Sequence, residues 1–257
     1  MTSRWVSRLA GIACGIAATY GIAAARDASV NAAQQPTPCT LVGTPTTRLS
    51  SDSTAQGRVV FIGGGVLLKC PSRGMTLRGD SAERYPDHDY MIGHTVYDEP
   101  RFHVTSDYLN YFPSQEIVKA VGSVVARLAN GSTLTGPYAE YRRPLKGVRP
   151  HQQISAIARP TIHIVQLDSV KKSTDTTVVI ANTVFMDGDS LIYAGGQVEI
   201  TRPEIVATAD SSFIDETTDM MHLIRQPVLK GTKSKPFTLT GDLIDLYSRK
   251  HKLQRVL

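Results

Sequence analysis

The chain has 257 residues, of which 41% are hydrophobic, and its 28 Lys and Arg against 23 Asp and Glu give a formal net charge of +5. This length and hydrophobic content suffice for one domain with a buried core. The small basic excess does not provide the concentrated basic face that nucleic-acid-binding proteins use, so no nucleic-acid partner is expected.

Residues 1–25 are typical of a signal peptide. Arg4 and Arg8 precede an apolar run, Leu9–Ala25, which ends in the small-residue cleavage pattern Ala23-Ala24-Ala25. We therefore expect export to the periplasm, and the mature chain without Arg4 and Arg8 would carry 26 basic and 23 acidic residues. The alternatives are a short uncleaved anchor in the inner membrane and a lipoprotein signal at Cys14.

Residues 26–57 are rich in Ala, Thr, Ser, Gln and Pro and show no periodicity. This composition predicts a flexible arm before a folded domain at 58–257. Cys39 and Cys70 remain after cleavage, and an oxidising compartment favours a disulfide between them. The alternative is a pair of free or buried thiols.

The predicted domain begins with two short strands in Arg58–Cys70, separated by Gly63-Gly64-Gly65. A phosphate-binding loop would need a helix after the glycines, whereas Val66–Cys70 is typical of a strand. Further downstream, segments rich in Thr, Val, Ile and Tyr alternate with turn signals, which predicts an all-β protein. Glu116–Leu128 also fits a helical stripe, but its valines and the following Asn130-Gly131 favour a strand.

One pattern recurs along the domain: alternating apolar and polar residues, then a small residue, then usually Asp. The small residues are Gly79, Ser106, Gly136, Ala181, Ala209 and Gly241. Alternation predicts a strand with one buried face, and the small residue with Asp predicts a bend or bulge. The spacings of 27, 30, 45, 28 and 32 residues predict about six stacked two-strand repeats.

The long spacing of 45 residues contains a basic loop insertion near 142–160. Its arginines are Arg142, Arg143, Arg149 and Arg159. Such a loop can contact lipid phosphates or an anionic membrane surface. The alternative, which we favour from the sequence, is a solvated loop without a partner.

The repeats resemble those of the OstA/LptA-like family of lipopolysaccharide-transport proteins. The family motif of alternating residues, a small residue and a later Tyr is present at Leu77–Tyr85 and Leu134–Tyr141, and the returning strand carries Gly-x-Val at Gly122-Ser123-Val124 and Gly196-Gln197-Val198. The resemblance covers about residues 58–257. Pro137 and Asn182 depart from the Asp of the pattern, and the insertion and the long arm also differ from it.

The resemblance implies an open β-jellyroll, or β-taco, whose two sheet faces enclose an apolar groove for the acyl chains of lipopolysaccharide. It implies a non-enzymatic periplasmic lipid carrier without a cofactor. The implied partners are lipopolysaccharide or a related glycolipid, and other β-jellyroll components or copies of itself stacked through edge strands. The alternatives are an inner-membrane-anchored, LptC-like component, an envelope scaffold that binds no lipid, and a β-solenoid glycan hydrolase.

The positions two and four residues before each small residue form one strand face, which is apolar except at Ser132 and Thr177. The groove-lining candidates on this face are Met75, Leu77, Phe102, Val104, Leu134, Val179, Ile205, Phe237 and Leu239. From the sequence alone, this face can line a lipid groove or seal an ordinary core.

No sequence pattern typical of catalysis is present. The run Asp87-His88-Asp89 and the nearby His94 have metal-ligand chemistry, but the run follows Pro86, where a hairpin turn is expected, so no metal site is predicted. The recurring Asp residues are Asp80, Asp107, Asp210 and Asp242. They are reminiscent of the paired acids of glycosidases, but their equivalent positions in the repeat favour a structural bend.

Overall fold

The computed structural model describes residues 39–55, 57–168, 173–232, 236–249 and 252–257. All of them belong to one compact unit, Pro36–Leu257. The predicted signal peptide and the first part of the predicted arm lie outside the described residues. The described part is all-β, as predicted, and its only helix is the single turn η1 (Pro71–Arg73). Within it, no helix is long and apolar enough to cross a membrane.

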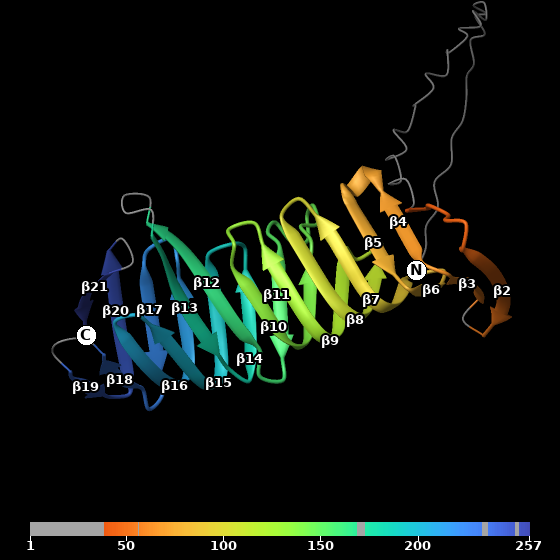
Figure 1. Ribbon diagram of the computed structural model, residues 1–257. Coiled ribbons are helices and arrows are strands. Elements are labelled where there is room, and N and C mark those ends of the chain that lie inside the picture. Colours follow the sequence, from red (N-terminus) through yellow and green to blue (C-terminus); the bar gives the residue numbers. More distant parts are fainter. Residues whose placement is uncertain (1–38, 56, 169–172, 233–235, 250–251) are drawn as a thin grey trace, which may run out of the picture. The chain divides into compact units, whose positions relative to one another are not determined.

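The 21 strands form one continuous antiparallel system that bends into two facing sheets (Figure 1). In order across it, sheet I contains β2 (Arg48–Thr54), β3 (Gly57–Gly63), β6 (Ser81–Arg84), β7 (Asp89–Glu99), β8 (Phe102–Phe112), β9 (Ile117–Leu128), β10 (Thr133–Arg142), β11 (Gln153–Ile157), β14 (Thr183–Asp187), β15 (Leu191–Arg202), β16 (Ile205–Asp215), β17 (Met220–Ile224), β20 (Leu243–Arg249) and β21 (Lys252–Val256). Sheet II contains β1 (Thr40–Leu41), β4 (Val66–Cys70), β5 (Met75–Gly79), β7, β8, β9, β10, β12 (Thr161–Asp168), β13 (Ser173–Ile180), β15, β16, β18 (Val228–Gly231) and β19 (Thr238–Thr240).

The long strands β7, β8, β9, β10, β15 and β16 cross from one sheet to the other. Between β10 and β15 the crossing is made by separate strands, with β11 and β14 in sheet I and β12 and β13 in sheet II. The pairings β10–β11–β14–β15–β13–β12 therefore form a closed ring of six antiparallel strands. Within this ring, β10 and β15 are the two strands that pass from one sheet to the other.

The six small residues of the repeat mark the places where the chain passes from sheet II to sheet I. Ser106, Gly136 and Ala209 lie at the bends within β8, β10 and β16. Gly79 is the last residue of β5, and Ala181 and Gly241 lie between consecutive strands. A bend needs a small residue because the two sheets approach closely there. We call the line of these bends the fold line, and the opposite margin, where the turns lie, the rim.

A second kind of bend carries the chain from sheet I back to sheet II. It consists of two consecutive residues with positive φ, at Gly64-Gly65, Gly93-His94, Gly122-Ser123, Ala158-Arg159, Gly196-Gln197 and Arg225-Gln226. Neighbouring bends are hydrogen-bonded to each other, as where the Asn182 amide donates to the Gly196 carbonyl at 2.8 Å. The two kinds of bend therefore alternate along the fold line.

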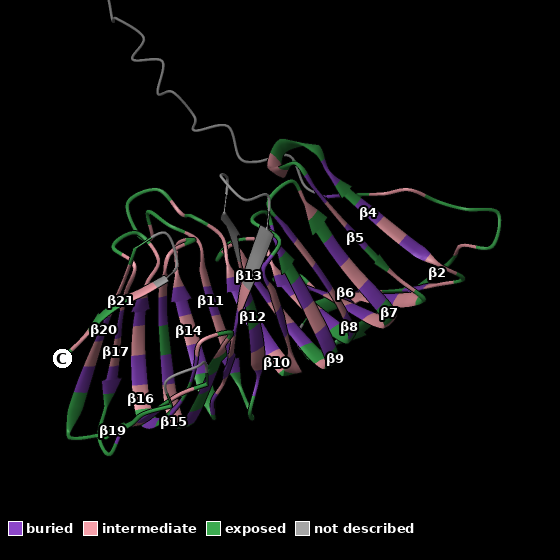
Figure 2. Cartoon of the chain, turned by 60° about the vertical axis from the view of Figure 1, so that its left-hand side comes forward, coloured by how far each residue is buried: buried purple, intermediate pink, exposed green. Residues whose placement is uncertain are grey.

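The core lies between the two sheets. In most strands, alternate residues point inward and are buried, while their neighbours are exposed or half-buried (Figure 2). The buried residues form one continuous cluster along the described unit. Glu116–Leu128, the segment with a possible helical stripe, is strand β9 from Ile117 onward, so the strand prediction is confirmed.

The domain begins earlier than predicted, because β1 and β2 lie within residues 26–57. Every residue of β2 is exposed, so its sequence carries no apolar alternation, and its conformation comes from backbone pairing with β3. The predicted insertion at 142–160 is also partly a strand, since β11 pairs with β10 and β14. The loop is therefore confined to residues 143–152.

Candidate lipid-binding interior and its rim

An unbroken row of apolar side chains runs along the inner face of sheet II. Direct cross-strand pairing places in it Leu41, Leu68, Leu77, Tyr97, Val104, Ala126, Leu134, Ile162, Val179, Ile200, Ala207, Leu229 and Leu239. The row is buried from Leu68 to Leu229, whereas Leu239 is 40% exposed. The apolar interior therefore reaches the surface at the C-terminal end of the sheet.

The predicted groove residues fall into two groups. The buried group, in which no side chain is more than 3% exposed, consists of Met75, Leu77, Phe102, Val104, Leu134, Val179 and Ile205. Phe237 and Leu239 are 38% and 40% exposed, because they lie at or beside β19, the last strand of sheet II among the described residues. The first group is covered in the interior, so among the predicted groove residues only Phe237 and Leu239 reach the surface.

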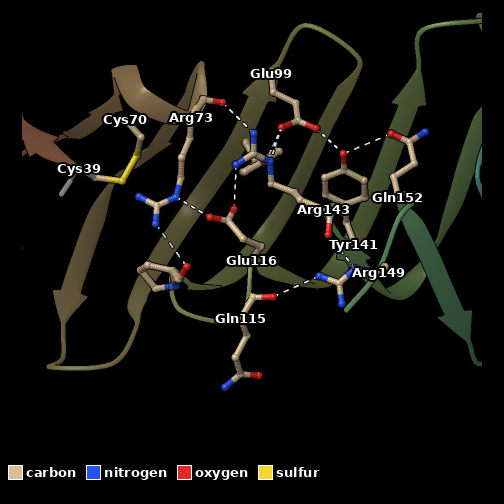
Figure 3. A network of polar contacts seen from close by, with 12 residues as sticks. Cys39, Cys70, Arg73, Glu99, Gln115, Glu116, Tyr141, Arg143, Arg149 and Gln152 are labelled. Carbon is tan, nitrogen blue, oxygen red and sulfur yellow. Dashed lines mark hydrogen bonds and ion pairs between the residues drawn. A yellow bond between two sulfur atoms is a disulfide. The ribbon is translucent and has the colours of Figure 1, made fainter. Parts of the chain in front are cut away.

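Charged groups bridge the rims of the two sheets in the N-terminal half (Figure 3). Arg73, which ends η1 in line with sheet II, places its Nε 2.7 Å from Oε1 of Glu116 in the β8–β9 turn of sheet I. Arg143, which follows β10, contacts Glu116 and Glu99 at 2.8 Å each. These four residues, called the rim cluster below, are largely buried, with side-chain exposures of 7% to 18%.

The rim cluster is continuous with buried tyrosines. The Tyr141 hydroxyl donates to Glu99, and its ring stacks on Phe102 with centroids 3.9 Å apart. Burial raises the pKa of Tyr97 and Tyr141 above the ordinary range, so both hydroxyls remain protonated donors. Burial lowers the pKa of Arg143, but the carboxylates of Glu99 and Glu116 oppose this and its pKa is raised overall, so this guanidinium stays charged.

A cleft of ≈ 720 Å³ lies beside the rim cluster. Its lining includes Arg73, Arg101, Tyr141, Arg143, His151 and Gln152. Arg101 and Gln152 both contact Asp189, the latter at 2.6 Å, so polar groups of both rims meet here. The described lining contains no Ser, Cys or Thr with a neighbouring base in the arrangement that nucleophilic catalysis needs.

The arginines of the predicted basic insertion are engaged within the chain. Arg142 contacts Glu140 at 2.6 Å and Arg159 contacts Glu199 at 2.5 Å. Arg149 donates to the Arg143 carbonyl at 2.7 Å. These groups therefore do not gather into a free cationic patch, as would be expected of a lipid-phosphate site in this loop.

Cys39 and Cys70 form a disulfide that fastens the start of the described chain to β4 (Figure 3). The carbonyl of Cys39 also accepts a hydrogen bond from Arg84, whose guanidinium contacts Asp89 at 2.6 Å. The bridge holds β1 at the margin of sheet II and lies three residues from Arg73 of the rim cluster.

The histidine and aspartate residues considered as metal ligands do not converge. His88 contacts Asp87 at 2.8 Å and His94 contacts Asp80 at 2.7 Å, whereas Asp89 pairs with Arg84. Within the described residues, no group of three His, Cys, Asp or Glu side chains could hold a metal ion. The recurring aspartates, Asp80, Asp107, Asp210 and Asp242, lie at separate bends of the fold line rather than as a facing acid pair.

Sequence reasoning missed the rim cluster and also Arg202, which faces the interior at the rim of the C-terminal half. Glu99 and Glu116 lie at strand ends and turns with no distinguishing pattern, and only the fold brings them to Arg143.

No protein-family model matches this chain, and a search of curated proteins finds no match.

Proposed function

We propose that this protein is a non-enzymatic periplasmic lipid carrier of the OstA/LptA-like type, which takes part in lipopolysaccharide transport to the outer membrane. The two facing sheets are, in this proposal, an open β-jellyroll of about six two-strand repeats. The main support is the apolar row on sheet II, which runs across the whole sheet and reaches the surface at Leu239. Acyl chains require an apolar surface of this kind and few polar groups.

The uncovered strands at both ends of the sheets support partners that stack on them. At one end β1 and β2 have no further strand beside them among the described residues, and at the other end β19 and β21 have none. Free strand edges pair readily with another chain. Other β-jellyroll components, or copies of this protein, would continue the sheets and the apolar row.

An envelope scaffold that binds no lipid is the second candidate, because most groove candidates are buried to the level of an ordinary core. An inner-membrane-anchored, LptC-like role depends on residues 1–25, which lie outside the described residues. The mature N-terminus, read by mass spectrometry, distinguishes the anchored form from the cleaved one.

Lipid binding tests the proposal. Protein purified from its own envelope is examined by native mass spectrometry for a bound glycolipid, and the delipidated protein is then titrated with lipopolysaccharide. Leu239→Asp should weaken uptake at least about tenfold, because it places a charge at the exposed end of the apolar row. Leu243→Asp is the matched control, since Leu243 is 52% exposed and flanks the inward residue Ile244 on β20.

Two results would contradict the carrier function. One is wild-type protein that contains no lipid and takes up none, which favours the scaffold. The other is equal uptake by both folded variants, which would show that the apolar row does not contact the lipid.

A further inference from the structure

Arg202 bridges the interior between the two sheets at the rim of the C-terminal half. It is the last residue of β15 and pairs directly with Ile205, which is buried. Its Nε donates to Thr177 Oγ1 at 3.0 Å, and its Nη1 donates to Ser248 Oγ at 3.3 Å. Thr177 belongs to sheet II and Ser248 to sheet I, so the guanidinium lies between the rims.

Arg202 differs from the arginines of the rim cluster in having no ion pair with any described residue. Arg73 and Arg143 each contact glutamate oxygens at 2.7 to 2.8 Å. Arg202 has only two neutral hydroxyls as partners. Burial lowers its pKa, and Glu216 and Asp219 oppose this shift only through space.

Arg202 is half-buried. A cation that has lost part of its water without an anion in contact is unfavourable, because it gains no counter-charge in exchange. The surroundings offer apolar contact instead. Ile200 and Leu246, two residues before Arg202 and Ser248 on the same inner faces, are at most 1% exposed. An amphiphile would therefore suit this site, because its anionic group can pair with Arg202 and its apolar part can contact the neighbouring apolar interior.

We propose that Arg202, with the hydroxyls of Thr177 and Ser248, binds the anionic phosphate or carboxylate group of the lipid that this protein carries. This inference rests on the proposed carrier function and locates the head group at the rim of the C-terminal half. The planar guanidinium fork matches the oxygens of phosphate and carboxylate, and two flanking hydroxyls can donate to the remaining oxygens.

A buried hydroxyl without a hydrogen-bond partner lies in the same half. The Ser212 hydroxyl on β16 is buried and makes no hydrogen bond within the described structure. Ser212 pairs with Ala194 and Leu223, both inward-facing. A hydroxyl of this kind can hydrogen-bond the polar linkage between head group and acyl chains, and the N-terminal half has one as well, at Tyr111.

The test measures binding of three probes to the full mature protein by isothermal titration calorimetry. The probes are dihexanoyl phosphatidic acid, the neutral dihexanoylglycerol and inorganic phosphate. In the wild type, phosphatidic acid should bind at least about tenfold more tightly than dihexanoylglycerol, as a charge-assisted contact provides. Arg202→Gln should abolish this preference without changing the affinity for dihexanoylglycerol, and Arg202→Lys should retain part of it.

Arg225→Gln is the matched control, because it removes an exposed guanidinium on the fold line, paired with Asp210 at 3.3 Å. Circular dichroism and thermal melting establish that each variant is folded. A wild type without preference for phosphatidic acid, or a preference that survives in folded Arg202→Gln, would overturn the inference. Inorganic phosphate binding as tightly as phosphatidic acid would also overturn it, because the acyl chains would then contribute nothing. If neither lipid binds, the carrier function itself fails.

Discussion

At the scale of single residues, the fold line depends on backbone conformations that only a few residues tolerate. Gly196 has φ +74°, and a Cβ there would lie 2.7 Å from Nδ2 of Asn182 on the neighbouring bend. Gly65 has φ +88°, but a Cβ there would meet nothing within 4 Å. Substitution at Gly65 therefore tests backbone strain alone, whereas substitution at Gly196 tests backbone strain together with crowding between adjacent bends.

Gly196→Ala should therefore destabilise the protein more than Gly65→Ala. Positive φ costs both variants about 1 to 2 kcal/mol, and the clash with Asn182 should add about 1 to 3 kcal/mol to the first. Urea denaturation of both variants measures the difference in the free energy of unfolding. Equal values would show that neighbouring bends are not in tight contact.

His94, in the bend beside Gly93, provides a prediction on pH. Its hydrogen bond with Asp80, and the charge of that carboxylate, raise the pKa of His94 above its ordinary value of 6.5. A raised pKa means that the folded state holds the proton more tightly than the unfolded state does. The pair therefore stabilises the fold below pH 6.5. This contribution disappears as the pH rises through the pKa of His94 in the folded state. Because both groups are exposed, solvent screens the effect on stability.

Nuclear magnetic resonance titration of the His94 ring should therefore give a pKa above that of a model peptide. In Asp80→Asn the value should fall back toward the ordinary one. An unchanged His94 titration in that variant would show that the contact with Asp80 does not form in solution.

The residues of the first kind of bend could be read from the sequence because each carries its signal locally, as a small residue followed by Asp or Asn, or by Pro137 in the case of Gly136. The second kind could be read only in part. Gly122 and Gly196 mark two of these bends, but Ala158-Arg159 and Arg225-Gln226 take positive φ without a glycine. Their conformation is imposed by the neighbouring bends, which no local pattern reveals.

At the scale of elements, the rim cluster joins η1, the β8–β9 turn and the segment after β10. Glu116 is its central member, because it contacts both Arg73 and Arg143. Removing one partner of a buried charged network leaves the others uncompensated, which makes such networks sensitive to single substitutions.

Glu116→Gln should lower the free energy of unfolding by about 3 to 5 kcal/mol, because two buried guanidinium groups lose a shared carboxylate. Asp210→Asn should cost less than about 1 kcal/mol, since it breaks the exposed pair with Arg225. Chemical denaturation of the two variants tests this contrast. Similar losses for both would place the rim cluster in contact with water rather than in the core.

Strands with one buried face were predictable from alternation, and so was the assignment of residues such as Leu77 and Leu134 to a common inner face. The strand β2 was not, because all of its side chains are exposed and only its pairing with β3 shapes it. The rim cluster and Arg202 were also beyond prediction. Their partners lie far away in the chain, 46 residues for Arg202 and Ser248 and 70 residues for Arg143 and Arg73. They become neighbours only when the two rims meet.

At the scale of the whole described unit, each pass of the chain across the two sheets pairs mainly with the passes beside it. Stability in such a stack is approximately a sum over units and the interfaces between neighbours. A unit consists of one crossing of the chain from sheet II to sheet I and one crossing back, because only after both does the same kind of bend recur.

Deletion of residues 182–209 joins Ala181 directly to Asp210 and removes one whole unit between equivalent bends. The shortened protein should unfold cooperatively, with a urea m-value lowered roughly in proportion to the surface removed. Deletion of residues 182–196 alone removes β14 and the sheet I half of β15 but keeps the sheet II half of β15 beside β13. Sheet I would then be two strand positions shorter than sheet II, and this mismatch should prevent cooperative folding. Circular dichroism during urea unfolding distinguishes the two, and two equally disordered products would contradict the unit structure.

The alternation of the two kinds of bend has a consequence for the reach of the molecule. A viable change of length must add or remove both kinds together, which corresponds to two adjacent strand positions in each sheet. With neighbouring strands about 4.8 Å apart, the distance that the protein spans can change only in steps of about 10 Å. Its span is thus a discrete quantity, adjustable by duplication or loss of whole units without redesign of the bends.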